Sequence, residues 1–213
     1  MPTKPVLYHC ADARSFRALW ALEELGLDYE LRLLPFPPRF LSPEYLKENP
    51  LGTIPLLVDG DTRMTESSAI IQYLATRDGP SSLSVEAGDP AYGAWLNGLH
   101  HGEATLTFPQ TLVLRYTRLE PPEKRNPQVA EDYGRWFNAR LKLLDGRLAA
   151  SDWWCADRFT GADISVGYAL LLARSLDLHT RFSPAVNAYW ARLEARAGFQ
   201  AAKSAQGEAS IAP

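Results

Sequence analysis

The sequence predicts a chain of two parts, an α/β domain followed by an all-helical domain. Two observations support this prediction. Residues 1–78 alternate short apolar runs typical of strands with helical patterns, in the order βαβαββα. After a segment rich in Gly, Pro and Ser, apolar residues recur only with helical spacing. We therefore expect an N-terminal domain over residues 1–78, a linker over 79–90 and a helical domain over 91–213.

The first elements form a strand, helix, strand unit. Val6-Leu7-Tyr8 is apolar and short, and the loop after it leads to a helix that begins near Ser15. Gly26 stands where the residue after a helix end is expected. Residues 29–33 alternate like a second strand. Such a unit predicts that its two strands pair in parallel. A short second helix is expected to begin at Ser42-Pro43.

The central stretch of the sequence runs from residue 49 to residue 71, NPLGTIPLLVDGDTRMTESSAII. Asp59-Gly60 separates two short strand-like runs and predicts a hairpin turn. Before the first run stands Ile54-Pro55, and an X-Pro bond of this kind can be cis, which turns the chain sharply. Proline cannot donate to a sheet ladder. We therefore expect the backbone N–H and C=O of Ile54 to be exposed and able to pair with an extended peptide.

Directly after the hairpin, Thr65-Glu66-Ser67-Ser68 opens a helical pattern. Hydroxyl side chains and unpaired backbone N–H groups at the N-terminus of a helix form a seat for an anion. One short segment is therefore predicted to offer a backbone edge and a carboxylate seat side by side. This combination suits a small, anionic, peptide-like ligand.

The second half of the chain is predicted to be helical throughout. One long helix is expected from Tyr92 to about Arg118, another over residues 133–148, and a third from Ser183-Pro184 to about Gly198. Thr160 and Asp163 stand at the N-cap and N3 positions of a capping box, flanked by Phe159 and Ile164 as a hydrophobic staple. Residues 204–213 carry no pattern, and we expect this tail to be mobile.

Composition excludes several classes of function. The 213 residues carry a net charge of −3 and no basic run, which argues against a nucleic-acid partner. No apolar run approaches the roughly 20 residues of a membrane span, and the N-terminus lacks the pattern of a signal peptide. Two cysteines, far apart and in no CxxC motif, argue against a disulfide framework or a zinc site. These features are typical of a cytoplasmic protein.

The motif NPxGxxP, followed by a turn and by Glu66-Ser67, resembles the glutathione-binding half of the cytosolic glutathione S-transferase family, in its bacterial type. The FTGAD segment from Phe159 resembles the F-T-x-A-D of the family's helical domain, so the likeness covers nearly the whole chain. The resemblance implies a thioredoxin-like N-terminal domain, a homodimer, and glutathione as the co-substrate. It implies an enzyme of detoxification that ionises glutathione and attacks electrophilic substrates with the resulting thiolate.

The resemblance also implies which residues bind glutathione. Ile54, beside Pro55, would pair through its backbone with the cysteinyl part of the tripeptide. Glu66 would take the γ-glutamyl ammonium, and Ser67 the γ-glutamyl carboxylate, aided by the helix N-terminus. The glycyl carboxylate needs a cation, for which the candidates are Arg39 and, second, Lys47.

The residue that activates the thiol is less clear from the sequence. In the family it follows the first strand, and alignment without gaps places the usual serine at Asp12 or Ala13. An Asp carboxylate would repel a thiolate and raise its pKa. The neighbouring candidates are Ser15, which has a hydroxyl near a helix N-terminus, Cys10, which resembles in position the cysteine of some bacterial members, and Arg14, which carries a positive charge.

The helical domain is expected to contribute the pocket for a small hydrophobic electrophile, lined by His101, Phe108, Arg115 and Tyr116. His100 and His101 are adjacent rather than i, i+4, so a metal pair is not predicted. Two alternative functions remain open. One is a glutathione-dependent disulfide-bond reductase or peroxidase that uses Cys10. The other is a non-catalytic glutathione-binding interaction protein, which the acidic residue at Asp12 suggests.

Overall fold

The computed structural model describes residues 4–207. They form two compact units, the first made of residues 1–84 and 195–213 and the second of residues 85–194, each limited here to its described part. The sequence assigned all residues from 91 onward to the helical domain. In the structure the segment from residue 195 onward belongs to the first unit instead, because the C-terminal helix packs there. No helix in the described range is both long and apolar enough to cross a membrane.

The first unit is built on a four-stranded sheet with the order β2-β1-β3-β4. Its strands are β1 (Val6–His9), β2 (Glu30–Leu33), β3 (Leu56–Asp59) and β4 (Thr62–Met64). As predicted, β1 pairs with β2 in parallel and with β3 in antiparallel, and β3 and β4 form the hairpin. Gly60, in the hairpin turn, has a φ of +58°, which glycine adopts without strain.

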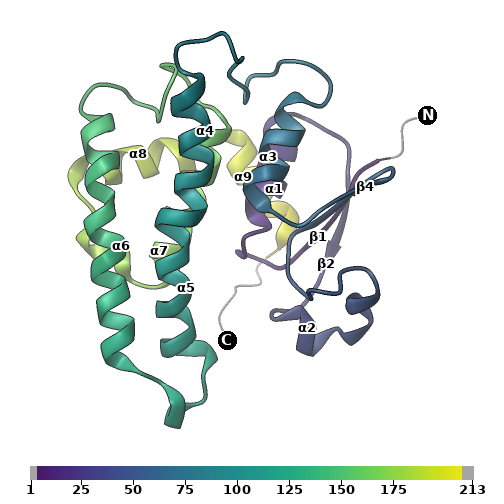
Figure 1. Cartoon of the computed structure of the whole chain (residues 1–213), viewed down its shortest axis with the longest axis vertical. Helices are drawn as coiled ribbons and strands as arrows, with labels where there is room; N and C mark the ends of the chain where they lie inside the picture. The colour runs from purple at the N-terminus through teal and green to yellow at the C-terminus, as the bar shows by residue number, and fades with distance from the viewer. Residues whose placement is uncertain (1–3, 208–213) are drawn as a thin grey trace. The chain divides into compact units, whose positions relative to one another are not determined.

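Three helices, α1 (Phe16–Glu24), α3 (Ser67–Thr76) and α9 (Ala197–Gln206), gather on one face of this sheet, as Figure 1 shows. Aromatic rings join α9 to α1, since Phe199 lies 5.4 Å from the Phe16 ring and 5.0 Å from the Trp20 ring. The opposite face carries α2 (Pro38–Leu41) and a 3-10 helix over Pro43–Lys47. There Tyr8 of β1 packs against Tyr45 at a ring distance of 5.3 Å.

The second unit is helical, as expected. One continuous path contains α4 (Tyr92–His100), a π-helical stretch over His101–Thr107, α5 (Phe108–Leu114) and a second π-helical stretch over Arg115–Leu119. In Figure 1, α6 runs along this path. The remaining helices are α6 (Pro127–Leu148), α7 (Gly161–Ser175), α8 (Pro184–Glu194), and short 3-10 turns over Pro122–Lys124 and Leu178–Arg181. Ser165 of α7 donates to the carbonyl oxygen of Leu99 at 2.6 Å, so an acceptor next to the π-helical stretch is satisfied from another helix.

The predicted capping box is confirmed at the start of α7. Asp163 accepts from the backbone N–H of Thr160 at 2.8 Å, and Thr160 accepts through its hydroxyl from Ala162. The fully buried Asp163 also receives hydrogen bonds from the Trp154 backbone and the Tyr189 hydroxyl. The box therefore ties the preceding loop and α8 to α7.

Two predictions about the helices were wrong. The helix from Ser183 ends at Glu194 rather than near Gly198, which lies in the first turn of α9. Residues 204–206 belong to the last turn of α9, whereas the sequence predicted a mobile tail from residue 204; residues 208–213 of that tail lie outside the described residues. Ala195 and Arg196 separate the two helices, and Arg196 has an extended backbone.

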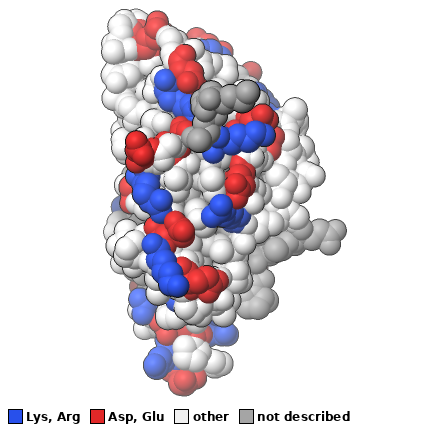
Figure 2. Space-filling model, turned by 90° about the vertical axis from the view of Figure 1, so that its right-hand side faces the viewer, with Lys and Arg blue, Asp and Glu red and all other residues white. Residues whose placement is uncertain are grey.

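Charges on the surface are mixed in sign. Figure 2 shows acidic and basic side chains intermingled on one face. Exposed ion pairs occur among the described residues, such as Arg63 with Glu48 at 3.0 Å. Exposed pairs of this kind contribute little to stability. The mixture does agree with the absence of a basic run in the sequence.

Candidate functional site

The turn before β3 presents an open backbone edge. The Ile54–Pro55 peptide bond is cis, as predicted. The carbonyl of Thr53 accepts from the Tyr45 hydroxyl at 2.7 Å and from the Asn49 amide at 2.8 Å, which fixes the turn. Ile54 is only 8% exposed, yet within residues 4–207 its backbone N–H and C=O have no hydrogen-bond partner. Buried backbone groups are nearly always paired, so this edge is suited to an incoming peptide.

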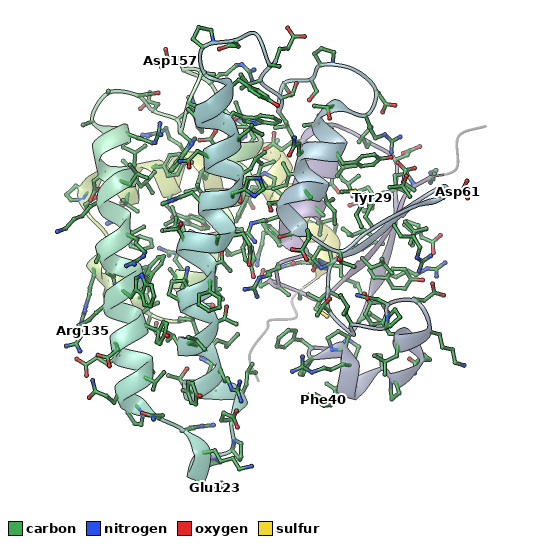
Figure 3. The ribbon with its side chains drawn as sticks, viewed as in Figure 1. Tyr29, Phe40, Asp61, Glu123, Arg135 and Asp157 are labelled. Atoms are coloured by element: carbon green, nitrogen blue, oxygen red, sulfur yellow. The ribbon has the colours of Figure 1, made fainter. Side chains whose placement is uncertain are left out.

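Gly52 brings Arg39 close to this edge. The φ of Gly52 is +59°, and a Cβ atom there would lie 2.6 Å from the Cβ of Arg39. Only a glycine allows the backbone of the turn to approach α2 so closely. The guanidinium of Arg39 lies over the Phe40 ring at 4.8 Å, and Figure 3 shows Phe40 on the outside of α2, directed away from the strands. The predicted cation is therefore an exposed group near the Ile54 turn.

The second candidate for the glycyl carboxylate has a different setting. Lys47 lines a cavity of about 330 Å³ on the α2 side of the sheet. Its other lining residues are Tyr8, Arg32, Leu34, Glu44, Tyr45 and Glu48. Glu44 and Glu48 also line this cavity, so its charge is mixed. A carboxylate would therefore bind less favourably here than beside Arg39.

At the start of α3, Ser67 has a buried cation behind it. Ser67 is 3% exposed, and its Oγ accepts from Nη1 of Arg17 at 3.2 Å; Arg17 itself is fully buried. The Ser67 hydroxyl hydrogen is not used in this bond, so it is available to the carboxylate of a ligand. Glu66 is exposed at the N-cap position and makes no ion pair among the described residues. The helix N-terminus, a hydroxyl donor and a guanidinium together favour a carboxylate at Ser67.

The contribution of Arg17 was missed by the sequence analysis. Its position follows the helical spacing of α1, whose residues Phe16 to Leu22 are all buried. A charged residue in the middle of such a run is seldom buried without partners. That conflict between charge and pattern was the signal available in the sequence.

The loop between β1 and α1 holds the three candidates for thiol activation. Cys10 is fully buried, its Sγ lies 3.6 Å from the carbonyl oxygen of Pro35, and burial raises the pKa of its thiol to about 12. A thiol of this kind stays protonated at neutral pH, which disfavours a nucleophilic role. Ser15 is fully buried too, and its hydroxyl both accepts from the Cys10 backbone N–H and donates to the Cys10 carbonyl oxygen, each at 3.3 Å. These contacts favour a structural role for both residues.

Arg14 is the candidate whose side chain is partly exposed. It precedes α1 in the same loop, and its carbonyl oxygen accepts from the backbone N–H of Arg17 at 3.3 Å. A guanidinium there places positive charge at the loop, and a positive charge lowers the pKa of a nearby thiol. Of the three candidates, Arg14 therefore has the setting most compatible with thiol activation.

Asp12 is one of the two positions, with Ala13, at which the family resemblance placed the usual serine. Its φ is +52°, and its carboxylate accepts from Lys203 and Gln206 of α9, each at 2.6 Å. Its backbone N–H donates to Oε1 of Gln206 at 3.0 Å. The side chain is therefore bound to α9, an interaction that no local sequence pattern announces.

In the second unit, the four predicted pocket residues do not share one setting. The ring of His101 packs against the Trp154 ring, with 5.2 Å between the ring centres. Its pKa is lowered mainly by burial and also by the positive charge of Arg147. Its Nε2 is buried without a hydrogen-bond partner among the described residues. These features are typical of a packing residue.

The other three predicted pocket residues lie further along the same helical path. Phe108 is 52% exposed, and Arg115, seven residues later, falls on the same side of a helix. The guanidinium of Arg115 forms an ion pair with Glu120 at 2.7 Å and lies 5.5 Å from the Tyr116 ring centre. The structure thus brings Arg115 and Tyr116 together and leaves Phe108 as an apolar surface group.

Comparisons with known proteins agree on the family. A sequence model of the glutathione S-transferase N-terminal domain matches residues 13–77, and one of the C-terminal domain matches residues 110–197. Glutathione S-transferase 3 of Zea mays is 30% identical over 197 residues, which cover 86% of each chain. Glutathione S-transferase GstB of Escherichia coli K12 is 31% identical over 158 residues, 70% of this chain and 73% of the relative.

Solved structures give the same answer for the fold. A glutathione transferase from Methylococcus capsulatus superposes with a TM-score of 0.84 at 27% identity, covering 95% of this chain and 98% of the other. The glutathione transferase URE2P6 of Phanerochaete chrysosporium, solved in complex with oxidized glutathione, also has a TM-score of 0.84 at 27% identity, with 97% and 98% covered. The chain therefore belongs to the glutathione S-transferase family.

Proposed function

We propose that the chain is a glutathione transferase, which binds glutathione in its first unit and uses the thiolate to attack electrophilic carbon. The observation that carries this proposal is the unpaired backbone of Ile54, which stands beside a fixed turn in a largely buried position. An extended tripeptide would satisfy both backbone groups, as a strand added to a sheet edge does. The complex of URE2P6 with oxidized glutathione supports the choice of ligand.

The ends of the tripeptide are assigned by charge. In the proposal Ser67 and the α3 N-terminus bind the γ-glutamyl carboxylate, with Arg17 behind Ser67, and Glu66 binds the γ-glutamyl ammonium. Arg39, which Gly52 brings close to the Ile54 turn, binds the glycyl carboxylate. Arg14 supplies positive charge to the thiol. Catalysis would then come from holding the two reactants together and stabilising the thiolate.

The wider setting is also part of the proposal. We place the enzyme in the cytoplasm, with a role in detoxification of small hydrophobic electrophiles, for which Phe108, Arg115 and Tyr116 are the candidate contacts. A homodimer is supported by large apolar side chains left exposed in the first unit, since such groups often mark an interface. They are Leu33, Phe40, Leu41, Leu46 and Leu51.

The test combines binding and turnover. The chain should be retained on immobilised glutathione and should conjugate glutathione to a chloronitrobenzene. Ser67→Ala removes a hydrogen-bond donor to a charged group, so glutathione affinity should fall by about 2 kcal/mol, which is roughly 30-fold. Ser68→Ala is the matched control, because its hydroxyl is the next along α3 and does not meet Arg17. Equal affinities for the two variants in calorimetry would contradict the role of Ser67.

A second candidate is a glutathione-binding protein without catalysis. The observation in its favour is the loop itself, where Cys10 and Ser15 are committed to internal contacts and Asp12 is acidic. Retention on immobilised glutathione without turnover of any electrophile would support this reading over the transferase.

The reductase or peroxidase alternative depends on Cys10. Since burial raises the pKa of Cys10 to about 12, we expect Cys10→Ser to keep conjugation activity within about twofold of the wild type. Alkylation of Cys10 by iodoacetamide should be slow at neutral pH. A variant that loses both conjugation and the reduction of glutathione mixed disulfides would instead favour a redox role.

A further inference from the structure

The end of α9 is joined to the loop that follows β1 by a partly buried polar cluster. Gln206 is 2% exposed, and its side chain reaches both His9 and Asp12. Lys203, one turn earlier on α9, donates to the same carboxylate oxygen of Asp12, Oδ1, as Gln206 does. The side chain of Asp12 is 15% exposed and that of Lys203 is 34% exposed.

The hydrogen bonds fix the orientation of the Gln206 amide. The backbone N–H of Asp12 can only donate, so the atom it meets at 3.0 Å must be the carbonyl oxygen, Oε1. The amide nitrogen of Gln206 then faces the Asp12 carboxylate, and Nε2 of His9 must carry the hydrogen that it shares with Oε1. One side chain therefore satisfies a backbone donor, a buried histidine and a carboxylate at once.

The contacts of Asp12 in this cluster explain how an acidic residue can stand in the loop that is proposed to face the thiol. A carboxylate near the thiol of bound glutathione would oppose its ionisation. Here the charge of Asp12 is neutralised by Lys203, and its side chain is turned to α9. The left-handed backbone at Asp12, with φ at +52°, is held by the same contacts, because Gln206 bonds to both the N–H and the carboxylate of this residue.

We propose that Asp12 is a positioning residue of the thiol-facing loop, anchored by Gln206 and neutralised by Lys203 from α9. The inference rests on the proposed function, because it takes the loop over residues 10–15 to face the thiol. While its charge is paired with Lys203, Asp12 acts on the loop through its contacts with α9 and is not a catalytic group. The neighbouring titratable or charged groups are His9, at the end of β1, and Cys10 and Arg14, in the loop.

The decisive experiment is a double-mutant cycle on Lys203 and Asp12. The measured quantity is the pKa of the thiol of bound glutathione, obtained from the ultraviolet absorbance of the thiolate. Lys203→Met keeps the length of the side chain and removes its charge, so the less compensated negative charge of Asp12 should raise that pKa by about one unit. The turnover number at neutral pH should fall, with the KM for glutathione little changed. Adding Asp12→Asn should restore the pKa, since Asn tolerates a left-handed backbone.

Lys4→Met is the matched control for this cycle, because Lys4 forms an exposed ion pair with Asp28 at 3.3 Å in the same unit. It should leave the thiol pKa unchanged. An unchanged pKa in Lys203→Met, or a failure of Asp12→Asn to restore it, would overturn the proposal. If the wild-type chain binds no glutathione at all, the proposed function is refuted instead.

The anchoring by Gln206 has a readout that needs no ligand. Gln206→Met should speed amide hydrogen exchange over residues 10–15 about tenfold, because it removes the partner of the Asp12 N–H. Arg196→Met is the control, since Arg196 anchors the other end of α9 through two bonds of 2.8 Å to Glu24. It should affect the start of α9 and leave the loop unchanged. Equal exchange in the two variants would contradict the anchor.

Discussion

His9 is a histidine that must fold in its neutral form. It is fully buried, and burial lowers its pKa to about 4 despite the hydrogen bond to Gln206. The added proton would go to Nδ1, which has no hydrogen-bond partner among the described residues. Protonation therefore costs the folded state more than the unfolded chain, in which the pKa of histidine is about 6.5.

The sign of the pH effect follows from this difference. Between pH 6.5 and 4 the unfolded chain binds more protons at His9 than the folded chain does, so the free energy of unfolding rises with pH. We expect a loss of about 3 kcal/mol on acidification through this window. His9→Gln removes the titrating ring and keeps an amide donor, so its stability measured by urea unfolding should depend less on pH. Parallel pH profiles for the two proteins would contradict the assignment.

Single residues show where prediction from the sequence fails. Ile54 and Ser67 were singled out by one motif and Arg39 separately as a candidate cation, and the structure places all three in the first unit, with Arg39 close to the turn that carries Ile54. The chemistry of Asp12 could be read from the sequence, but its partners Lys203 and Gln206 lie about 190 residues away in the sequence. Local patterns carry no information on such pairs, since they depend on tertiary packing.

At the scale of elements, the turn from Asn49 to Pro55 illustrates how a motif becomes geometry. Asn49 and Tyr45 fix the Thr53 carbonyl, and Gly52 lets the turn approach α2. Each residue type is required for its own reason. The motif therefore encodes the shape of the turn, and the unpaired edge at Ile54 is a consequence of that shape.

Two glycines allow this turn to be tested. Gly52→Ala adds a Cβ that would lie 2.6 Å from Arg39, as well as a left-handed backbone, and we expect a loss of about 3 kcal/mol in stability together with weaker glutathione binding. Gly60→Ala is the matched control, because φ is +58° there and nothing lies within 4 Å. It should cost only about 1 kcal/mol and leave binding intact. If the two variants lost the same free energy of unfolding in urea, the close approach of Gly52 to Arg39 would not be what requires a glycine.

Most elements could be predicted, and the exceptions have physical causes. Strong caps and turns, as at Thr160 and Gly60, marked α7 and the hairpin. The start of α9 was missed because Gly198 looks like a helix terminator, whereas a Cβ there would clash with Glu24 at 2.6 Å, so its role is close packing. The π-helical stretches have no sequence period of their own, and Ser165 satisfies the neighbouring carbonyl of Leu99 from α7.

At the scale of the whole molecule, the first unit is assembled from two ends of the chain. Phe199 of α9 is 2% exposed and packs edge-on against Phe16 and Trp20 of α1, and Arg196 pairs with Glu24 at the end of α1. The predicted boundary at residue 91 assigned this segment to the helical domain by sequence continuity. Continuity is a poor guide where a terminal helix covers an apolar face elsewhere.

The packing of α9 against α1 can be tested by substitution and hydrogen exchange. Phe199→Ala leaves a cavity against two aromatic rings, so we expect a loss of about 3 kcal/mol and faster hydrogen exchange throughout α1. Phe137→Ala is the control, since Phe137 is fully buried in the second unit. It should destabilise α6 more than α1. Exchange in α1 that responds equally to both substitutions would mean that α9 has no special part in the first unit.

Because the first unit is discontinuous in sequence, its parts are synthesised at different times. Domains generally acquire their structure in the order in which the ribosome releases them. Here the sheet and α1 emerge early, whereas Phe199, Lys203 and Gln206 follow the entire stretch 85–194. Until they arrive, the aromatic rings of α1 and the carboxylate of Asp12 lack their covering. A nascent polypeptide that lacks α9 would thus leave the Phe16 and Trp20 rings of α1 without their Phe199 partner.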